Sequence, residues 1–345
     1  MNNAKRPLLI GLCVLLSIIL AAMVIGTIYV ESIFSRIGDL DQATLSSSEA
    51  EALKNMTDDP SDLDPTAPTL NPEDVTMPTG PVEVITGGED VVNILLVGQD
   101  RREGQGRQRS DAMILCTINK TTKTITLTSF LRDMYVMIPN YYRDRINAAY
   151  QLGGFKTLNA TLENNFGVRA DHCIEVDFSG FENIINVLGG VDVELTQAEA
   201  DYLNRRGNWG VDNGNFDWHL TAGVNTLTGD QALAYSRIRA LDSDWGRTNR
   251  QRVVLSALLQ KAKTMDLGQV NDFINEVLPM IATDMTPAQI TGYALDLLPI
   301  LSGATINTQT IPADGTWQYA TIKGAAVITV NFEKNQQVLR EIIEG

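Results

Sequence analysis

The chain has 345 residues, and its 42 acidic and 27 basic side chains give a formal net charge of −15. This length is enough for one large domain with additions or for two ordinary domains. The negative charge argues against a protein that coats duplex nucleic acid through basic side chains.

An apolar segment near the N-terminus predicts a membrane anchor. Residues 8–30 carry no charge, and as a helix they would span about 35 Å, enough to cross a bilayer core. The segment is too long for the apolar part of a signal peptide. Because Lys5 and Arg6 precede it and Glu31 follows it, we expect residues 1–7 in the cytoplasm and the rest of the chain outside. A buried core helix, the alternative, would normally carry polar interruptions.

Residues 31–90 form an acidic segment that is predicted to be a linker outside the membrane. They contain 14 acidic and 2 basic side chains, and six prolines lie between positions 57 and 86. Such a composition buries too little apolar surface to offset the entropy cost of ordering the chain. We expect an extended, self-repelling spacer between the membrane and the folded body. An acidic interaction tail is the alternative.

Residues 91–345 have the pattern of one folded domain. The predicted strands lie at residues 91–97, 112–118, 124–130, 172–178, 191–195, 306–311 and 326–332, and the predicted helices lie at residues 155–165, 181–188, 228–234, 248–263, 270–282 and 287–298, with a last helix ending at residue 343. This alternation predicts an α/β fold, a three-layer α/β/α domain with a mixed central sheet. The apolar stripe over residues 181–188 is interpreted as ordinary core, and no role is assigned to residues 268–345.

Several common catalytic motifs are absent from the sequence. It contains no Gly-x-Ser-x-Gly, no His-Glu-x-x-His and no Cys-x-x-Cys, and we expect its two histidines, His172 and His219, to be structural. Three cysteines cannot form a disulfide framework. Only Cys116 and Cys173 could pair, and their apolar surroundings favour buried free thiols.

Arginines dominate the basic residues of the predicted domain. They gather around residues 101–109, 132–145 and 237–252. Arginine fits bidentate recognition of phosphate or carboxylate, because its planar fork of donors matches two oxygens. For any single arginine, a surface salt bridge is the simpler interpretation.

Two neighbouring arginines are separated by one apolar residue. On an extended segment, this spacing puts the Arg237 and Arg239 guanidinium groups and the Tyr235 ring on one face and leaves Ile238 for the core. The pattern therefore predicts a paired anion clamp.

A second basic group opens the helix predicted over residues 248–263. Arg247, Arg250 and Gln251 are spaced to share one face of it. Cations at a helix N-terminus oppose the macrodipole, at a cost of about 0.3–1 kcal/mol each. A bound anion would reverse this cost, which favours a functional role for the cluster.

Two aspartates lie at the ends of neighbouring predicted strands. Asp100 follows the first strand, and Asp111 opens the second. Carboxylates placed in this way can share a Mg²⁺ ion that water and a substrate phosphate complete. Taken alone, the pair is more simply explained by salt bridges to nearby arginines. Beside the arginine clusters it suggests metal-assisted phosphoryl transfer.

These residues belong to an ordered set of motifs that resembles the LytR-CpsA-Psr family over about residues 91–264. The set comprises NILLVGQD at 93–100 with Arg102, RSD at 109–111, LRD at 131–133, RINAAY at 145–150, VDFSGF at 176–181, LGGV at 188–191, GDQALAYSRIR at 229–239, and GR at 246–247 with RQ at 250–251. Leu131 departs from the proline that is usual in this family.

The resemblance implies an α/β enzyme outside the membrane of a Gram-positive bacterium. Such enzymes transfer a teichoic acid, capsule or secondary wall polysaccharide from undecaprenyl pyrophosphate to a peptidoglycan hydroxyl and leave a phosphodiester link. By this resemblance, Asp100 and Asp111 would hold Mg²⁺. The implied pyrophosphate ligands are Arg102, Arg109, Arg132, Arg237, Arg239, Arg247 and Gln251, and the implied catalytic residues are Arg132, Arg237, Arg239 and Asp111.

Two other functions would use much the same residues. A non-catalytic protein that binds wall polyanions would need the arginines but not the metal carboxylates. A lipid-pyrophosphate hydrolase would use water in place of the wall hydroxyl. The aromatic residues Trp209, Phe216 and Trp218 form a candidate surface for the acceptor glycan, with packing of loop aromatics as the alternative.

Overall fold

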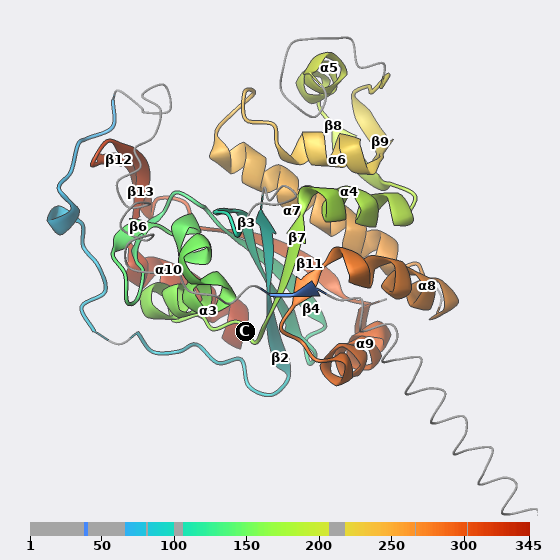
Figure 1. Cartoon of the computed structure of the whole chain (residues 1–345), viewed down its shortest axis with the longest axis horizontal. Helices are drawn as coiled ribbons and strands as arrows, with labels where there is room; N and C mark the ends of the chain where they lie inside the picture. The colour runs from blue at the N-terminus through green and yellow to red at the C-terminus, as the bar shows by residue number, and fades with distance from the viewer. Residues whose placement is uncertain are drawn as a thin grey trace, which may run out of the picture.

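The computed structural model describes residues 38–40, 66–80, 82–99, 106–206, 218–265, 267–301 and 303–345. A mixed sheet of seven strands forms the centre of this part of the chain (Figure 1). Its order is β1 (Gly38–Asp39), β10 (Ala282–Thr283), β7 (His172–Asp177), β2 (Val91–Gln99), β3 (Ser110–Asn119), β4 (Thr124–Phe130) and β11 (Thr305–Ile311). Strand β2 is antiparallel to β3 and parallel to β7, so the predicted mixed sheet is confirmed.

Helices cover both faces of the sheet, as the alternating pattern predicts (Figure 1). One face carries α3 (Asn147–Phe166) and α10 (Phe332–Glu344), and the other carries α4 (Phe178–Val187), α6 (Gly229–Ser236), α7 (Asp244–Ala262), α8 (Leu267–Val277) and α9 (Pro287–Leu301). Within β2, Leu95 and Val97 pack in the core on the α3 side, and Ile94 packs in the core on the α7 side. Burial on both faces explains why this strand is a continuous apolar run.

Three two-stranded ribbons lie outside the central sheet. They are β5 (Tyr135–Met137) with β6 (Arg143–Arg145), β8 (Val191–Leu195) with β9 (Gly223–Leu227), and β12 (Trp317–Ile322) with β13 (Ala325–Val330). Short 3₁₀ turns occupy Pro72–Asp74 and Leu278–Met280, and α5 (Gln197–Arg206) packs beside β8 and β9 around a separate apolar cluster. The strands predicted at 191–195 and 326–332 therefore exist, but each pairs within a ribbon.

The two described cysteines are buried free thiols, as expected from their apolar neighbours. Burial raises the pKa of the Cys116 thiol to about 12, and it raises the pKa of Cys173 well above its usual range. Neither thiol is therefore ionised near neutral pH.

Described parts of the predicted linker pack on the folded body. Strand β1 pairs with β10, and Leu40, Val75 and Ile85 are buried. The backbone N–H of Ile85 donates to the Gly167 carbonyl over 2.8 Å. A few apolar residues thus anchor a segment whose mean composition is acidic. For these residues, the structure replaces the expected extended spacer with a strap on the domain.

The predicted cytoplasmic residues 1–7 and the predicted anchor at 8–30 lie outside the described residues. In the part of the chain that is described, no helix is both long and apolar enough to span a bilayer.

Replacing Ile85 by alanine should destabilise the domain, because Ile85 is 3% exposed and belongs to the main core cluster. We expect a loss of about 2–4 kcal/mol in the free energy of unfolding, measured by urea denaturation. The control is Glu83→Ala two residues earlier, where the side chain is 81% exposed and its ion pair with Arg340 should contribute less than about 1 kcal/mol. Equal stability of the two variants would mean that this strap does not hold to the body.

Candidate functional site

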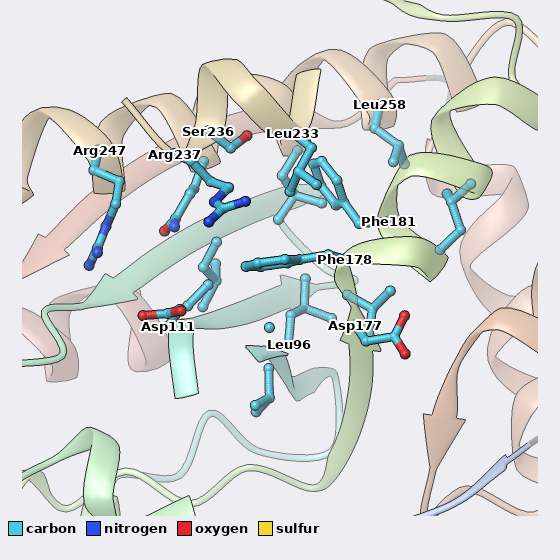
Figure 2. A pocket seen from close by; sticks show the side chains of 18 of the residues that line it. Leu96, Asp111, Asp177, Phe178, Phe181, Leu233, Ser236, Arg237, Arg247 and Leu258 are labelled. Carbon is cyan, nitrogen blue, oxygen red and sulfur yellow. The ribbon is translucent and has the colours of Figure 1, made fainter. Parts of the chain in front are cut away.

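A cavity of about 640 Å³ lies between the sheet and the helices of one face. Its apolar wall is formed by Leu96, Val97, Ala112, Ile114, Ile174, Val176, Phe178, Phe181, Ile184, Leu233, Ile238, Leu255, Leu258, Phe273, Val277 and Ile281. Asp111, Arg237, Arg239, Arg247 and Gln251 also line it. In Figure 2, Asp111, Arg237 and Arg247 gather on one side of the cavity, and Phe181 and Leu258 lie towards the other. The cavity is therefore amphipathic, with an arginine-rich charged end and a mainly apolar end. Asp177 lines the apolar side, where its Oδ1 accepts a hydrogen bond from the Gly180 N–H over 2.8 Å.

The apolar end was not predicted from the sequence. Phe181 and Ile184 line the cavity, whereas Ile185 of the same stripe is part of the buried core. Phe273 and Val277 of α8 also line it, in a region to which the sequence analysis assigned no role. A cavity wall and a core face carry the same apolar residues, so the stripe alone cannot distinguish them.

Arg237 and Arg239 both line the cavity, as a paired clamp requires, and their binding of an anion stays a prediction. They lie just beyond the end of α6, and between them Ile238 is 1% exposed and packs in the core. The Arg237 guanidinium lies 4.7 Å from the centre of the Phe178 ring, a cation–π contact at the border between the two ends of the cavity.

The predicted position of Tyr235 is wrong. A capping box between Thr228 and Gln231 starts a helix that includes Tyr235, so this residue is not on an extended segment with the two arginines. Its ring is buried and lies 5.9 Å from the Arg250 guanidinium, in a different part of the domain core.

Asp111 joins two guanidinium groups at the charged end. Its Oδ1 accepts a hydrogen bond from Arg132 Nη1 over 2.8 Å and lies 3.8 Å from Arg239 Nη2. Burial lowers the pKa of Arg132, but Asp133, Asp244 and Asp111 outweigh it and leave the pKa above the ordinary value. The salt-bridge interpretation of Asp111 therefore holds. Arg132 is not among the described side chains that line the cavity, but it contacts Asp111, which is.

The Arg247 guanidinium group is buried, and two of its nitrogen atoms lack hydrogen-bond acceptors among the described residues. The side chain is 3% exposed, and Nη2 lies 2.5 Å from Asp244 Oδ1. The Nε and Nη1 donors are buried without a hydrogen-bond partner among the described residues. Burial lowers the pKa of Arg247 to about 10. An anion in the cavity would supply both the missing acceptors and the missing charge.

Helix α7 starts four residues earlier than predicted. Asp244 therefore lies in its first turn, where a carboxylate offsets the conflict between Arg247 and the helix dipole. Gln251, one turn further on, lines the cavity, but Arg250 does not. Arg250 binds Glu199 over 2.7 Å and both carboxylate oxygens of Asp242, and is part of the internal scaffold.

The structure does not bring the remaining predicted residues into the cavity: one does not line it, and two lie outside the described part of the chain. Arg109 directly precedes β3 and is not among the described side chains that line the cavity. Asp100 and Arg102 lie outside the described residues. Gln99, which precedes Asp100, pairs with Ser110, the neighbour of Asp111. The described residues contain no group of three or more side chains that could hold a metal ion.

Comparisons with known proteins agree with the motif pattern. The model of the LytR_cpsA_psr family matches residues 46–343. A relative from Oceanobacillus iheyensis named polyisoprenyl-teichoic acid–peptidoglycan teichoic acid transferase TagU is 34% identical over 267 residues, which are 74% of this chain and 76% of the relative. The corresponding TagT of Bacillus subtilis strain 168 is 36% identical over 182 residues, or 52% of this chain and only 55% of that protein.

Solved structures show the same fold. A LytR-CPS2A-psr family protein, YwtF (TagT), with bound octaprenyl pyrophosphate lipid, superposes with a TM-score of 0.57 at 25% identity. The match covers 78% of this chain and 98% of that one.

The unpaired donors of Arg247 lead to a binding prediction. Inorganic pyrophosphate should raise the melting temperature of the protein, by an amount equivalent to about 2.7 kcal/mol at a hundred times its dissociation constant. In Arg247→Gln most of this shift should disappear, because the buried charge and its two free donors are gone. Arg169→Gln, which removes an exposed pair with Glu163, should keep the full shift. An undiminished shift in Arg247→Gln would rule out an anion site at this residue.

Proposed function

The chain belongs to the LytR-CpsA-Psr family, and from this premise we propose that it transfers an anionic glycopolymer from undecaprenyl pyrophosphate to a peptidoglycan hydroxyl. The observation that carries the proposal is the amphipathic cavity, which is apolar at one end and rich in arginine at the other. A prenyl pyrophosphate is likewise apolar at one end, the prenyl chain, and charged at the other, the pyrophosphate. Related proteins are named teichoic acid transferases, and a related structure holds octaprenyl pyrophosphate.

The apolar end of the cavity would take the prenyl chain of the donor. Phe178, Phe181 and Leu258 offer aromatic and aliphatic surface beside the arginines. Each CH₂ group that leaves water contributes about 0.8 kcal/mol, so even part of a prenyl chain would bind well. The chain would also fix the direction in which the pyrophosphate enters the charged end.

The arginines would neutralise the pyrophosphate and its transition state. The acceptor hydroxyl attacks the phosphorus atom that carries the glycopolymer, a new P–O bond forms, and the hydroxyl proton passes to a carboxylate at the charged end or to the departing prenyl phosphate. The bond from this phosphorus to the bridging oxygen breaks, and prenyl phosphate leaves with the electron pair. Arg237, Arg239 and Arg247 line the charged end of the cavity, where the charge of the transition state would develop, and the burial of Arg247 would strengthen its effect. Arg132 and Gln251 complete the donor set.

A Mg²⁺ ion fits the chemistry at the charged end. The donor would be the Asp111 carboxylate, which faces the cavity and makes both of its described contacts through Oδ1. The adjacency of Gln99 and Ser110 supports Asp100 as the second ligand, and Arg109 and Arg102 belong to the same stretch of chain. When bound, the metal would offset negative charge on the phosphate oxygens.

We further propose that residues 8–30 anchor the protein in the membrane and that the domain lies outside. Strand β1 begins at Gly38, eight residues after Val30, so the domain would lie close to the bilayer. Its lipid-linked donor is a component of the same membrane.

Asp111→Asn should lower kcat for polymer transfer by at least about 100-fold, because it removes the negative charge that would bind the metal ion and that neutralises Arg132. Transfer would be measured by mass spectrometry of peptidoglycan fragments after incubation with Mg²⁺ and a lipid-pyrophosphate glycan. Asp296→Asn, which affects only an exposed pair with Lys120, is the matched control.

Two results would contradict the transferase proposal. Wild-type activity in Asp111→Asn would favour a binding protein that does not need the metal carboxylate. Release of the polymer to water, with none attached to peptidoglycan, would favour a pyrophosphate hydrolase.

Ile184→Trp should discriminate between donors by chain length. The larger ring would fill part of the apolar end, so KM should rise about tenfold or more for a long-chain prenyl donor and little for a donor with a short chain. Ile184→Leu conserves volume and should resemble the wild type. An equal effect of Ile184→Trp on both donors would mean that the prenyl chain lies elsewhere.

A further inference from the structure

Three aromatic side chains contact one another in series beside the segments that carry Arg132 and Arg247; the Trp245 and Trp317 rings are tilted by 33°, and the Trp317 and Tyr319 rings meet edge to face at 75°. The ring centres of Trp245 and Trp317 are 4.7 Å apart, and those of Trp317 and Tyr319 are 4.9 Å apart. Trp245 comes from the first turn of α7. Trp317 and Tyr319 are two residues apart on β12, so their side chains lie on the same face of the strand. Tyr319 is 39% exposed, which is unusual among the large apolar side chains of the described residues. We call these three residues the aromatic platform.

The platform is attached to the two segments that carry Arg247 and Arg132. Trp245 follows Asp244, whose Oδ1 lies 2.5 Å from Arg247 and 3.7 Å from Arg132. On the other side, Tyr319 pairs across the β12–β13 ribbon with Ile328. The Ile328 N–H donates to the carbonyl of Asp133, the residue after Arg132, over 2.8 Å. The platform is thus held in a fixed position relative to the anion site.

Helix α7 sets the order of the three regions. Trp245 is followed by Arg247 and Gln251, and then by Leu255 and Leu258 of the apolar wall. At 1.5 Å per residue, Trp245 and Leu258 are about 20 Å apart along the helix axis. Figure 2 shows Arg247 and Leu258 at opposite ends of this arrangement. Along the axis of α7, Trp245 therefore lies on the far side of Arg247 from the apolar end, although a spacing of two residues turns its side chain roughly 160° away from that of Arg247.

In-line phosphoryl transfer assigns a direction to each reactant. The attacking and leaving oxygens lie on opposite sides of the phosphorus atom. With the prenyl chain at Leu255 and Leu258, prenyl phosphate leaves towards the apolar end. The acceptor hydroxyl must then arrive from the opposite end, where Trp245 lies.

On the basis of the proposed function, we propose that the aromatic platform binds pyranose rings of the acceptor glycan strand. Pyranose rings have an apolar C–H face, and tyrosine and tryptophan provide rigid, amphipathic contact surface at little entropy cost. The platform itself carries no charge, as suits uncharged sugar rings. The acceptor surface expected near Trp218 is less well supported, because that side chain packs against a separate apolar cluster and Trp209 and Phe216 lie outside the described residues.

Direct binding tests the platform without the reaction. The full chain in detergent micelles would be titrated with a β-1,4-linked N-acetylglucosamine tetrasaccharide, with intrinsic tryptophan fluorescence as the readout. Tyr319→Ala should weaken binding about threefold to tenfold, whereas Tyr319→Phe keeps the ring and should bind like the wild type. Gln318→Ala is the matched control, because Gln318 is exposed on the same strand but points to the opposite face. Equal affinity of Tyr319→Ala and the wild type would overturn the proposal.

Kinetics separate the acceptor from the donor. Tyr319→Ala should raise KM for a soluble peptidoglycan glycan about threefold to tenfold and leave KM for the lipid-linked donor unchanged. A rise confined to the donor KM would place the sugars of the donor on the platform and overturn the acceptor assignment.

The proposed function and the platform can fail separately. If the wild type binds the tetrasaccharide through Tyr319 but transfers no polymer, the platform stands and the transferase proposal falls. If the wild type transfers polymer and Tyr319→Ala matches it in both affinity and acceptor KM, the platform alone falls.

Discussion

Two carboxylates hold mutually repelling guanidinium groups together at the end of an apolar cavity, and the rest of the site depends on this arrangement. Asp111 binds Arg132 and lies near Arg239, while Asp244 contacts Arg247 and Arg132. Burial and the neighbouring arginines lower the pKa of both Arg239 and Arg247. Arg247 is thus a buried, incompletely neutralised positive charge beside the more exposed Arg239, and an anion is the group that would neutralise it.

Helix α7 sets the order in which the charged and apolar groups of the site follow one another. Along it, an indole ring, a buried guanidinium group, an amide and two leucine side chains follow one another from Trp245 to Leu258. Because these groups project from one rigid helix packed over the sheet, their order does not depend on a flexible loop. In the proposed function, a donor that is apolar at one end and phosphorylated in the middle would bind in one direction along this helix, and the acceptor would take the third position.

The packing features that the sequence does not predict have one physical cause in common. Leu40, Val75 and Ile85 pack on the body although they lie in an acidic, proline-rich segment, because single apolar residues can anchor a chain whose average polarity is high. Phe181 and Ile184 were assigned to the core because helical periodicity identifies an apolar face but not what lies opposite it. The face of α4 meets a void, and only neighbouring helices create that void.

The sequence by itself determined most of the central strands and of the helices, the buried free thiols and the family motifs, and it selected Asp111, Arg237, Arg239, Arg247 and Gln251, which the structure brings to one cavity. Local periodicity and residue chemistry suffice for these conclusions. The sequence did not predict α5, β5, β6, β9 or β12. Only the tertiary structure decided that Arg247 faces the cavity whereas Arg250, three residues later, binds Glu199 inside the scaffold. The reason is that the electrostatic partner of a buried arginine comes from distant parts of the chain, so its role follows from the packing of whole elements and not from its own neighbours in sequence.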